Sequence, residues 1–384
     1  MIYLDYAATT PIDSRVFETM KPYFSDSFGN PSSIHQYGQH AEAAVDNARE
    51  AIAVDLNCHP DEIIFTSCGT ESDNLALRGA ALAIHEKNGA NLLLTSKTEH
   101  HAVSKTAEQL EEYYGFKVEW LDADENGLVE PGAVEKMISN KTALVSVMYA
   151  NNEIGTINPI REIAEICHRH GVLFHTDAVQ AAAYLPVDVK MLGVDMMSLG
   201  GHKFYGPKGI GALYVRRGTP ILPIQTGGGQ ENGHRAGTQN VPYIVGFAEA
   251  VHQANIQREE RAGHVKPLRD LIIGTILETV PESRLTGHHD LRLPNHASFA
   301  FKGVDGNLLL TLLDSAGFAC SSGSACKTGN PEPSEVMGAI GLPREWGLGS
   351  LRITLGSGTT GDDVETFLNI LPGFIVKARA LAQN

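Results

Sequence analysis

From residue 61 to residue 215, short apolar runs alternate with segments of helical pattern. This alternation is typical of an α/β protein, in which helices cover both faces of one sheet. A helix is expected after the first run, because acidic residues follow that run closely and Gly89 ends the pattern. The expected strands lie within residues 61–67, 91–96, 117–123, 142–150 and 172–178, and residues 194–215 read as strand, glycine-rich turn and strand.

A second region follows one long helical stretch that starts near Val241. The chain has 384 residues, whereas a single hydrophobic core rarely grows beyond about 250–300 residues. We therefore expect the chain to cross into a second domain near residue 260. That domain should contain strands at 297–301 and 350–355, a helix at 306–317 and a closing helix from Gly361 onward.

The charge balance favours small-molecule chemistry. The formal net charge is −15 and no block of Lys or Arg stands out, so nucleic acids and anionic membrane surfaces are poor candidates for partners. The N-terminus lacks the basic and apolar regions of a signal peptide. No window approaches the roughly 18 apolar residues that span a bilayer. We expect no direct nucleic-acid partner, no membrane association and a cytoplasmic location.

Five cysteines are spread through the chain without a C-x-x-C or other zinc spacing, which favours reduced thiols. Cys320 and Cys326 lie in a segment rich in Gly, Ser and Pro, "ACSSGSACKTGNPEPS" (319–334). The residues alone leave three interpretations open: the two cysteines form a metal-binding or disulfide pair, one of them is a thiol that must move to do its work, or neither has a role. Metal is disfavoured, because no second Cys or His pair has finger-like spacing. Three others are expected to be small, partly buried apolar residues: Cys58, Cys68 and Cys167.

Residues with chemical potential follow the expected strands, where ligands bind in open α/β sheets. Gly69 and Thr70 begin a helix, and its free N–H groups suit a phosphate, although a plain helix cap explains Thr70 equally well. Asp177 ends a buried strand, where a carboxylate needs a cation, a salt bridge or a capping role. Lys203 lies beside His202 in a glycine-rich turn, and a solvated lysine is the plainer interpretation.

Together these features match the needs of pyridoxal 5'-phosphate. This cofactor requires a Schiff-base lysine, an acid at its pyridine nitrogen and a phosphate cradle. The chain lacks a strand-borne G-x-G-x-x-G and a G-x-x-x-x-G-K-[ST] motif, so nicotinamide and P-loop chemistry are less attractive.

A set of motifs distributed over the whole chain resembles cysteine desulfurases of the NifS/IscS type, in the class-V aminotransferase family. The resemblance implies pyridoxal-phosphate fold type I, with a mostly parallel seven-stranded sheet in a large domain and a smaller α/β C-terminal domain. The implied limits are 15–259 for the large domain, and 1–14 with 260–384 for the small domain that carries the cysteine loop. The motifs are "YLDYAATTP" (3–11), "GNPSSIHQYG" (29–38), "TSCGTES" (66–72), "TEHHAV" (98–103), "ANNEIGTINPI" (150–160), "HTDAVQ" (175–180), "GHKFYGPKGIGALYVRRG" (201–218), "GGGQENGHRAGTQNVP" (227–242) and "SSGSAC" (321–326).

The resemblance also implies roles around the cofactor ring. Lys203 forms the Schiff base and moves the substrate α-proton, and Asp177 pairs with the pyridine nitrogen. Gln180 and Asn152 hydrogen-bond the side of the ring that bears the hydroxyl. His100 stacks on the ring and acts as acid or base, a task that suits an imidazole. His101 has no such role and is expected at the surface.

Further roles concern the phosphate, the substrate and the subunit interface. Gly69, Thr70 and His202 match phosphate contacts, and Thr238 matches a residue supplied by the neighbouring subunit, which implies a homodimer. Arg352 matches the arginine that binds the substrate carboxylate, to which Asn152 also contributes. Asn30 lies in the matching N-terminal loop.

The implied reaction converts L-cysteine to L-alanine and leaves sulfur as a persulfide on Cys326, while Cys320 ends a short strand and packs. The sulfur would pass to an acceptor protein, such as an iron–sulfur scaffold or a tRNA-thiolation protein. An aminotransferase or a selenocysteine lyase on the same fold and a non-catalytic partner-binding member remain as alternatives. One departure bears on the cofactor: Gly200 stands where the family often has a serine that contacts the phosphate.

Overall fold

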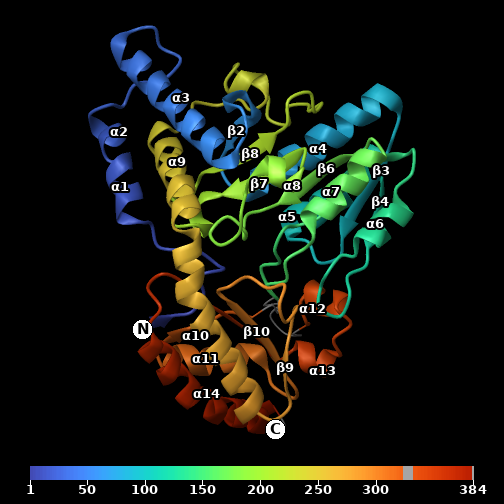
Figure 1. Ribbon diagram of the computed structural model, residues 1–384, viewed down its shortest axis with the longest axis vertical. Helices are drawn as coiled ribbons and strands as arrows, with labels where there is room; N and C mark the ends of the chain where they lie inside the picture. The colour runs from blue at the N-terminus through green and yellow to red at the C-terminus, as the bar shows by residue number, and fades with distance from the viewer. Residues whose placement is uncertain (323–331, 383–384) are drawn as a thin grey trace.

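Seven strands form the central sheet of the computed structural model, which describes residues 1–322 and 332–382 (Figure 1). The strand order is β2-β8-β7-β6-β5-β3-β4, and β8 alone runs antiparallel to its neighbours β7 and β2. The predicted mostly parallel sheet is therefore confirmed. The strands are β2 (Ile63–Thr66), β3 (Leu92–Ser96), β4 (Lys117–Leu121), β5 (Thr142–Ser146), β6 (Leu173–Asp177), β7 (Met196–Gly200) and β8 (Gly211–Val215).

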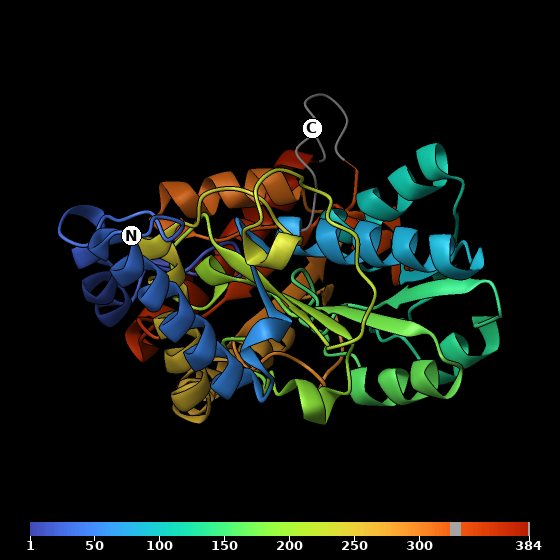
Figure 2. The same ribbon diagram turned by 90° about the horizontal axis from the view of Figure 1, so that it is seen from above.

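Helices cover both faces of this sheet, as the view from above shows (Figure 2). Successive residues of a strand point to opposite faces, and Ile64 and Phe65 of β2 accordingly belong to two different hydrophobic clusters. Strands buried on both faces explain the continuous apolar runs of the sequence. One cluster contains side chains of α4 (Gly69–Asn88) and α5 (His101–Tyr114); the other contains side chains of α3 (Gln36–Leu56), α7 (Ile160–Arg169) and α9 (Val241–Ile256).

The long helical stretch predicted after Val241 consists of two helices. α9 ends at Ile256, and α10 (Arg258–Thr279) begins after Gln257, whose backbone leaves the helical conformation. α10 leads into a second, smaller sheet of order β12-β10-β9, which lies with α11 and α14 in the lower part of Figure 1. The elements of this region are β9 (Ser283–Leu285), β10 (His296–Phe301), α11 (Gly306–Ser315), β12 (Ser350–Thr354) and α14 (Gly361–Ala382).

A two-stranded parallel pair joins the start of the chain to this smaller region. β1 (Ile2–Tyr3) pairs with β11 (Phe318–Ala319), the strand that ends just before Cys320. The domain limits implied above stay a prediction.

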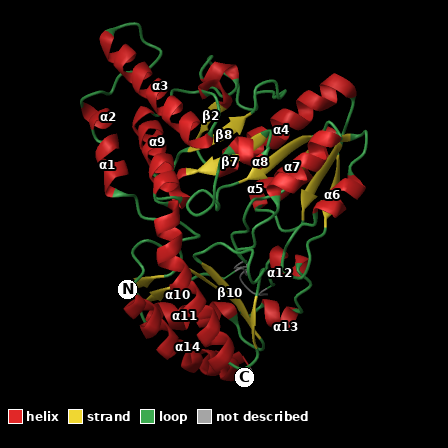
Figure 3. Ribbon diagram, in the orientation of Figure 1, coloured by secondary structure: helices red, strands yellow, loops and turns green. Residues whose placement is uncertain are grey.

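The remaining helices are short (Figure 3). No helix within the described ranges is both long and apolar enough to cross a membrane. The short helices are α1 (Ser14–Met20), α2 (Pro22–Ser25), α6 (Pro131–Met137), α8 (Val189–Leu192), α12 (Glu335–Ala339) and α13 (Arg344–Gly347), with single 3-10 turns at Pro60–Glu62, Gly201–Lys203 and Glu231–Gly233.

A buried ion pair fixes the glycine-rich loop before α9. Arg49 of α3 donates two hydrogen bonds to the carboxylate of Glu231, at 2.9 and 2.8 Å, and the Glu231 side chain is only 1% exposed. The same carboxylate accepts from the backbone N–H of Phe65 in β2 and from Gln239. Four donor atoms, two of them from Arg49, therefore bind one carboxylate, and this connects the loop to α3 and to β2 of the sheet.

Replacing Arg49 should cost much more stability than replacing an arginine of an exposed pair. Arg49→Met leaves the buried charge of Glu231 without its cation, and we expect a loss of about 3–5 kcal/mol in the free energy of unfolding. Arg169→Met is the matched control, because Arg169 pairs with Glu135 at 2.9 Å while both side chains are about half exposed. Its expected loss is about 1 kcal/mol or less. Equal losses in urea denaturation would contradict this account.

Candidate functional site

A cavity of about 370 Å³ lies at the carboxyl ends of β6 and β7, beside the start of α4. Nine of the residues singled out from the sequence line it. Eight of them lie at or shortly after the carboxyl ends of five strands of the large sheet, β2, β3, β5, β6 and β7, and Arg352 comes from β12 of the smaller one. The nine are Gly69, Thr70, His100, Asn152, Asp177, Gln180, His202, Lys203 and Arg352.

Lys203 is held by the N-terminal segment of the chain. Its Nζ donates hydrogen bonds to the carbonyl oxygens of Ala7 at 2.6 Å and Ala8 at 2.9 Å. Burial lowers the pKa of Lys203 to about 8, and the positive charge of Arg352 acts in the same direction, while Asp177 opposes the shift. At pH 7 an amine with this pKa is about one-tenth unprotonated, far more than an ordinary lysine, so it can act as a nucleophile or a base.

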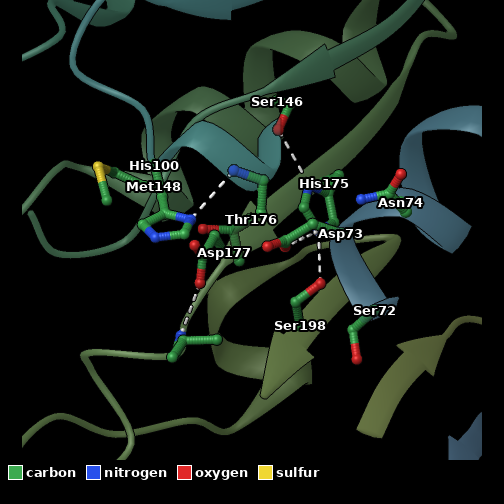
Figure 4. A network of polar contacts seen from close by, with 12 residues as sticks. Ser72, Asp73, Asn74, His100, Ser146, Met148, His175, Thr176, Asp177 and Ser198 are labelled. Atoms are coloured by element: carbon green, nitrogen blue, oxygen red, sulfur yellow. Dashed lines mark hydrogen bonds and ion pairs between the residues drawn. The ribbon is translucent and has the colours of Figure 1, made fainter. Parts of the chain in front are cut away.

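Asp177 and His100 lie close together (Figure 4), and both line the cavity with Lys203. Burial raises the pKa of Asp177, whereas the hydrogen bond that its Oδ1 accepts from the Val179 N–H at 2.8 Å and the charges of His100 and Lys203 oppose this rise. A cationic ring nitrogen placed against Asp177 would reinforce the ionised form. Asp177 thus suits a ligand that carries a protonated heterocycle.

His100 caps α5 and opens onto the cavity. Its Nδ1 accepts a hydrogen bond from the Ala102 N–H at 3.1 Å, so Nε2 carries the proton of the neutral ring. Partial burial lowers the pKa of His100, which keeps the ring neutral near pH 7. The neutral imidazole presents a flat apolar face and one exchangeable proton to a ligand.

The opposite end of the cavity suits an anion. α4 begins at Gly69 and has 20 residues, and its N-cap, Cys68, forms no side-chain capping bond. A Cβ atom at Gly69 would lie 2.6 Å from Cγ2 of Val179, so the close approach of backbone requires glycine here. His202, whose pKa burial lowers to about 4, is neutral and hydrogen-bonds Thr9. Free N–H groups and the helix dipole make this end a phosphate-suited cradle.

Arg352 reaches the cavity from the smaller sheet. Its Nη1 donates to the backbone carbonyl of Asn152 and its Nη2 to Oδ1 of Asp5, both at 2.9 Å. Within residues 1–322 and 332–382, its buried Nε has no hydrogen-bond partner. The side chain of Gln180 donates to the carbonyl of Ala7 at 2.9 Å. The cavity therefore joins an arginine suited to a carboxylate with an amine of lowered pKa.

Sequence reasoning missed a buried acid in this cavity. Asp73 projects from α4, is 1% exposed, and has an Oδ1 that finds no hydrogen-bond partner in the described part of the chain. Burial and the nearby charge of Asp177 raise its pKa well above the ordinary value. His175 lies 3.6 Å from it and hydrogen-bonds Ser146 and Ser198 (Figure 4). The inward face of α4 is otherwise apolar or small, so the only sequence signal was an acid at an inward position.

Two predicted residues, Thr238 and Asn30, do not line the cavity. Thr238 is exposed at a separate hollow of about 220 Å³, beside Arg235. Asn30 is exposed in the loop before α3, where its side chain accepts a hydrogen bond from the Ser32 N–H. Cys326 lies outside the described residues. His101 is 63% exposed, as predicted.

The other thiols follow the sequence interpretation in part. Cys320 packs against the main core, and burial raises its pKa, as it also raises the pKa of Cys58 and Cys167 to about 12. Cys68 is partly buried but also lines the cavity. In the described part of the chain, no group of three or more His, Cys, Asp or Glu could hold a metal ion.

Comparison with known proteins shows the family of this chain. The sequence profile described as Aminotransferase class-V matches residues 2–367. The chain belongs to the class-V aminotransferase family. Within this family it is 45% identical over 381 residues to the cysteine desulfurase IscS of Dictyoglomus turgidum, covering 99% of this chain and 96% of that protein. The resemblance to the NifS/IscS type is thereby confirmed.

Two solved structures of class-V relatives agree in fold. A structure titled NIFS-LIKE PROTEIN has a TM-score of 0.90 at 36% identity, covering 98% of this chain and 99% of that one. A structure titled SspA in complex with cysteine has a TM-score of 0.80 at 37% identity, covering 94% and 100%. The expected fold type I is confirmed.

The lowered pKa of Lys203 can be measured on protein freed of any bound aldehyde. Competitive acetylation across pH 6–10, followed by peptide mapping, should give a midpoint near pH 8 for Lys203, whereas an ordinary lysine titrates near about 10.4. Arg352→Gln should raise the midpoint, because a cation that disfavours the protonated amine is lost. Asp177→Asn should lower it for the opposite reason. A midpoint above pH 10 in the unsubstituted protein would refute the assignment.

Proposed function

We propose that this protein is a pyridoxal-5'-phosphate-dependent cysteine desulfurase that converts L-cysteine to L-alanine and transfers the sulfur to Cys326 as a persulfide. The observation that carries the proposal is the convergence of Lys203, Asp177 and Arg352 on one cavity. This convergence occurs in a chain whose desulfurase relatives match it over nearly its full length.

The residues of the cavity fit this cofactor. Lys203 would supply an amine of lowered pKa for a covalent bond to the aldehyde, and Asp177 would pair with the protonated pyridine nitrogen. Gly69 and Thr70 at the start of α4 and His202 supply the phosphate cradle, and His100 supplies a flat neutral ring. Gln180 and Asn152 are the candidates for the hydroxyl side of the ring. When bound, the cofactor supplies an electron sink.

The chain's own residues then perform three tasks. Arg352 and Asn152 orient the substrate carboxylate, so that the α-carbon faces Lys203. The unprotonated Lys203 amine takes the α-proton, and His100 donates or accepts a proton at its Nε2. The carbonyls of Ala7 and Ala8 accept hydrogen bonds from the Lys203 amine when it is not bonded to the cofactor.

Cys326 is the proposed nucleophile. Its thiolate forms a bond to the substrate sulfur while the carbon–sulfur bond breaks, and the carbon takes a proton and leaves as L-alanine. The described chain just before the Cys326 segment supports this role: the Ser321 and Arg352 backbones exchange hydrogen bonds of 2.7 and 3.3 Å. The segment that carries Cys326 therefore starts beside the residue that would bind the substrate carboxylate.

The proposal extends to partners and location. A homodimer would bring Thr238 of a second copy to the phosphate, and apolar side chains support an interface: Phe28 and Tyr37 are exposed with ring centroids 5.4 Å apart, and Ile34 is 93% exposed. The sulfur acceptor would be a protein such as an iron–sulfur scaffold or a tRNA-thiolation protein. A reducing cytoplasm suits the four free cysteines of the described residues.

Replacing Cys326 tests the reaction. Cys326→Ala should retain the visible absorption of the bound cofactor and lose sulfide and alanine production at least a hundredfold, because no thiolate remains to take the sulfur. Cys320→Ala is the matched control and should retain activity, because Cys320 packs against the core. Retained turnover in Cys326→Ala would instead indicate an aminotransferase or another activity that needs no loop thiol. An unchanged cofactor content in Lys203→Ala would contradict the covalent attachment.

Restoring a hydroxyl at Gly200 tests the phosphate cradle. A Cβ atom at Gly200 would lie 3.3 Å from the Gly69 nitrogen, so a serine there places its hydroxyl at the start of α4. Gly200→Ser should tighten cofactor binding about fivefold, the equivalent of one hydrogen bond of ~1 kcal/mol. Gly200→Ala adds the same Cβ without the hydroxyl and should bring no gain. Dissociation constants from cofactor titration of stripped protein provide the measurement, and equal constants for serine and alanine would exclude a phosphate contact here.

A further inference from the structure

The side-chain carboxylate of Asp5 already pairs with Arg352, the arginine that lines the cavity. Asp5 accepts a hydrogen bond from Nη2 of Arg352 at 2.9 Å, and both side chains are largely buried, with 17% and 9% exposed. Asp5 belongs to the N-terminal segment, and its role did not emerge from the sequence. The ion pair lies where the substrate carboxylate would bind, which raises the question of how two carboxylates use one guanidinium.

The geometry of the guanidinium makes the two carboxylates compete. A bidentate carboxylate uses either Nη1 with Nη2 or Nε with Nη2, and both pairs include Nη2. In the structure Nη2 donates to Asp5, Nη1 donates to the carbonyl of Asn152, and the buried Nε has no hydrogen-bond partner among the described residues. An incoming carboxylate that binds in the bidentate mode must therefore displace Asp5 or share Nη2 with it.

The backbone around Asp5 leaves it little freedom to move away. Asp5 forms a parallel bridge with Thr354 of β12, where the Thr354 N–H donates to the carbonyl of Leu4 at 2.9 Å. The hydroxyl of Tyr3 donates to the carbonyl of Asp5 at 3.0 Å. Asp5 and Arg352 thus project from neighbouring strands, and the negative charge of Asp5 stays close to any second carboxylate on the arginine.

We infer that Asp5 is a specificity-determining residue that competes with the substrate carboxylate for Arg352 and so sets the affinity of the site for α-amino acids. This inference rests on the proposed function, because it takes Arg352 as the carboxylate-binding residue. In the absence of substrate, Asp5 keeps the guanidinium oriented and neutralised. It thereby weakens the binding of simple anions, and a substrate must contribute further contacts through its amino group to bind well.

The test compares two probes on the cofactor-loaded protein. L-alanine carries the carboxylate, and ethylamine is the same molecule without it. Their dissociation constants are measured from the change in visible absorption. Asp5→Asn keeps an oxygen that accepts from Arg352 but removes the charge. It should tighten L-alanine binding at least fivefold and leave ethylamine binding unchanged. Asp5→Ala should tighten L-alanine binding as well. The thermal unfolding of each variant shows whether it folds.

Two controls separate the charge of Asp5 from other effects. Asp122→Asn removes an equal charge from an exposed side chain that pairs with Lys97, and it should leave both constants unchanged. In an Arg352→Gln background, Asp5→Asn should lose its effect on L-alanine, since a coupling between two residues disappears when one partner is absent.

The possible results test the inference about Asp5 separately from the proposed function. If Asp5→Asn leaves L-alanine binding unchanged or weakens it while Arg352→Gln weakens it strongly, Asp5 only positions the arginine, and the inference is overturned although the proposed function stands. If Arg352→Gln itself leaves the difference between L-alanine and ethylamine unchanged, the arginine does not bind the carboxylate, and both fail.

Discussion

The N-terminal ten residues hold the candidate site together, because they bridge the two sheets. Leu4 is hydrogen-bonded to Ala319 of β11 and to Thr354 of β12. A few residues later, the carbonyls of Ala7 and Ala8 accept from Lys203, and Thr10 donates to the carbonyl of His202 in the turn after β7. One segment therefore contacts both the lysine of the large sheet and the strand that carries the arginine of the small one.

Charge balance within the cavity follows from this arrangement. Lys203 and Arg352 line the cavity with two acids, Asp177 and Asp73, and a third acid, Asp5, pairs with Arg352. The acids differ in their surroundings: Asp177 lies near Lys203 and His100, and Asp73, which is 1% exposed, lies against neutral His175. Burial lowers the pKa of His175 to about 3, so that ring offers no positive charge to Asp73. Burial raises the pKa of both Asp177 and Asp73.

Much of the fold could be predicted from the chain because local patterns carry it. The continuous apolar runs gave strands β2 to β8 within a few residues, and Gly89 ends α4 in the left-handed conformation, as a helix-terminating glycine should. The break between α9 and α10 was missed, since Gln257 carries no local signal and the turn there depends on packing. Most site residues found by motif lie at or after strand ends, whereas Arg352 lies within β12. Asp73 and Asp5 were missed because Asp73 reaches the cavity, and Asp5 reaches Arg352, only through contacts between distant segments.

The sequence by itself determined the alternation of strand and helix, the residues placed at strand ends and the family to which they belong, since these depend on neighbours along the chain. Only the tertiary structure decided that Arg352 of β12 meets Asn152 and Asp5, that backbone carbonyls of Ala7 and Ala8 hold Lys203, and that the amine titrates near pH 8. Burial and Coulomb interactions act through space, and the residues that exert them on Lys203 are separated from it by up to 198 positions in the case of Asp5 and 149 in the case of Arg352. The spacing of residues along the chain does not show which of them lie close together in the fold, so the lowered pKa of Lys203 depends on the tertiary structure.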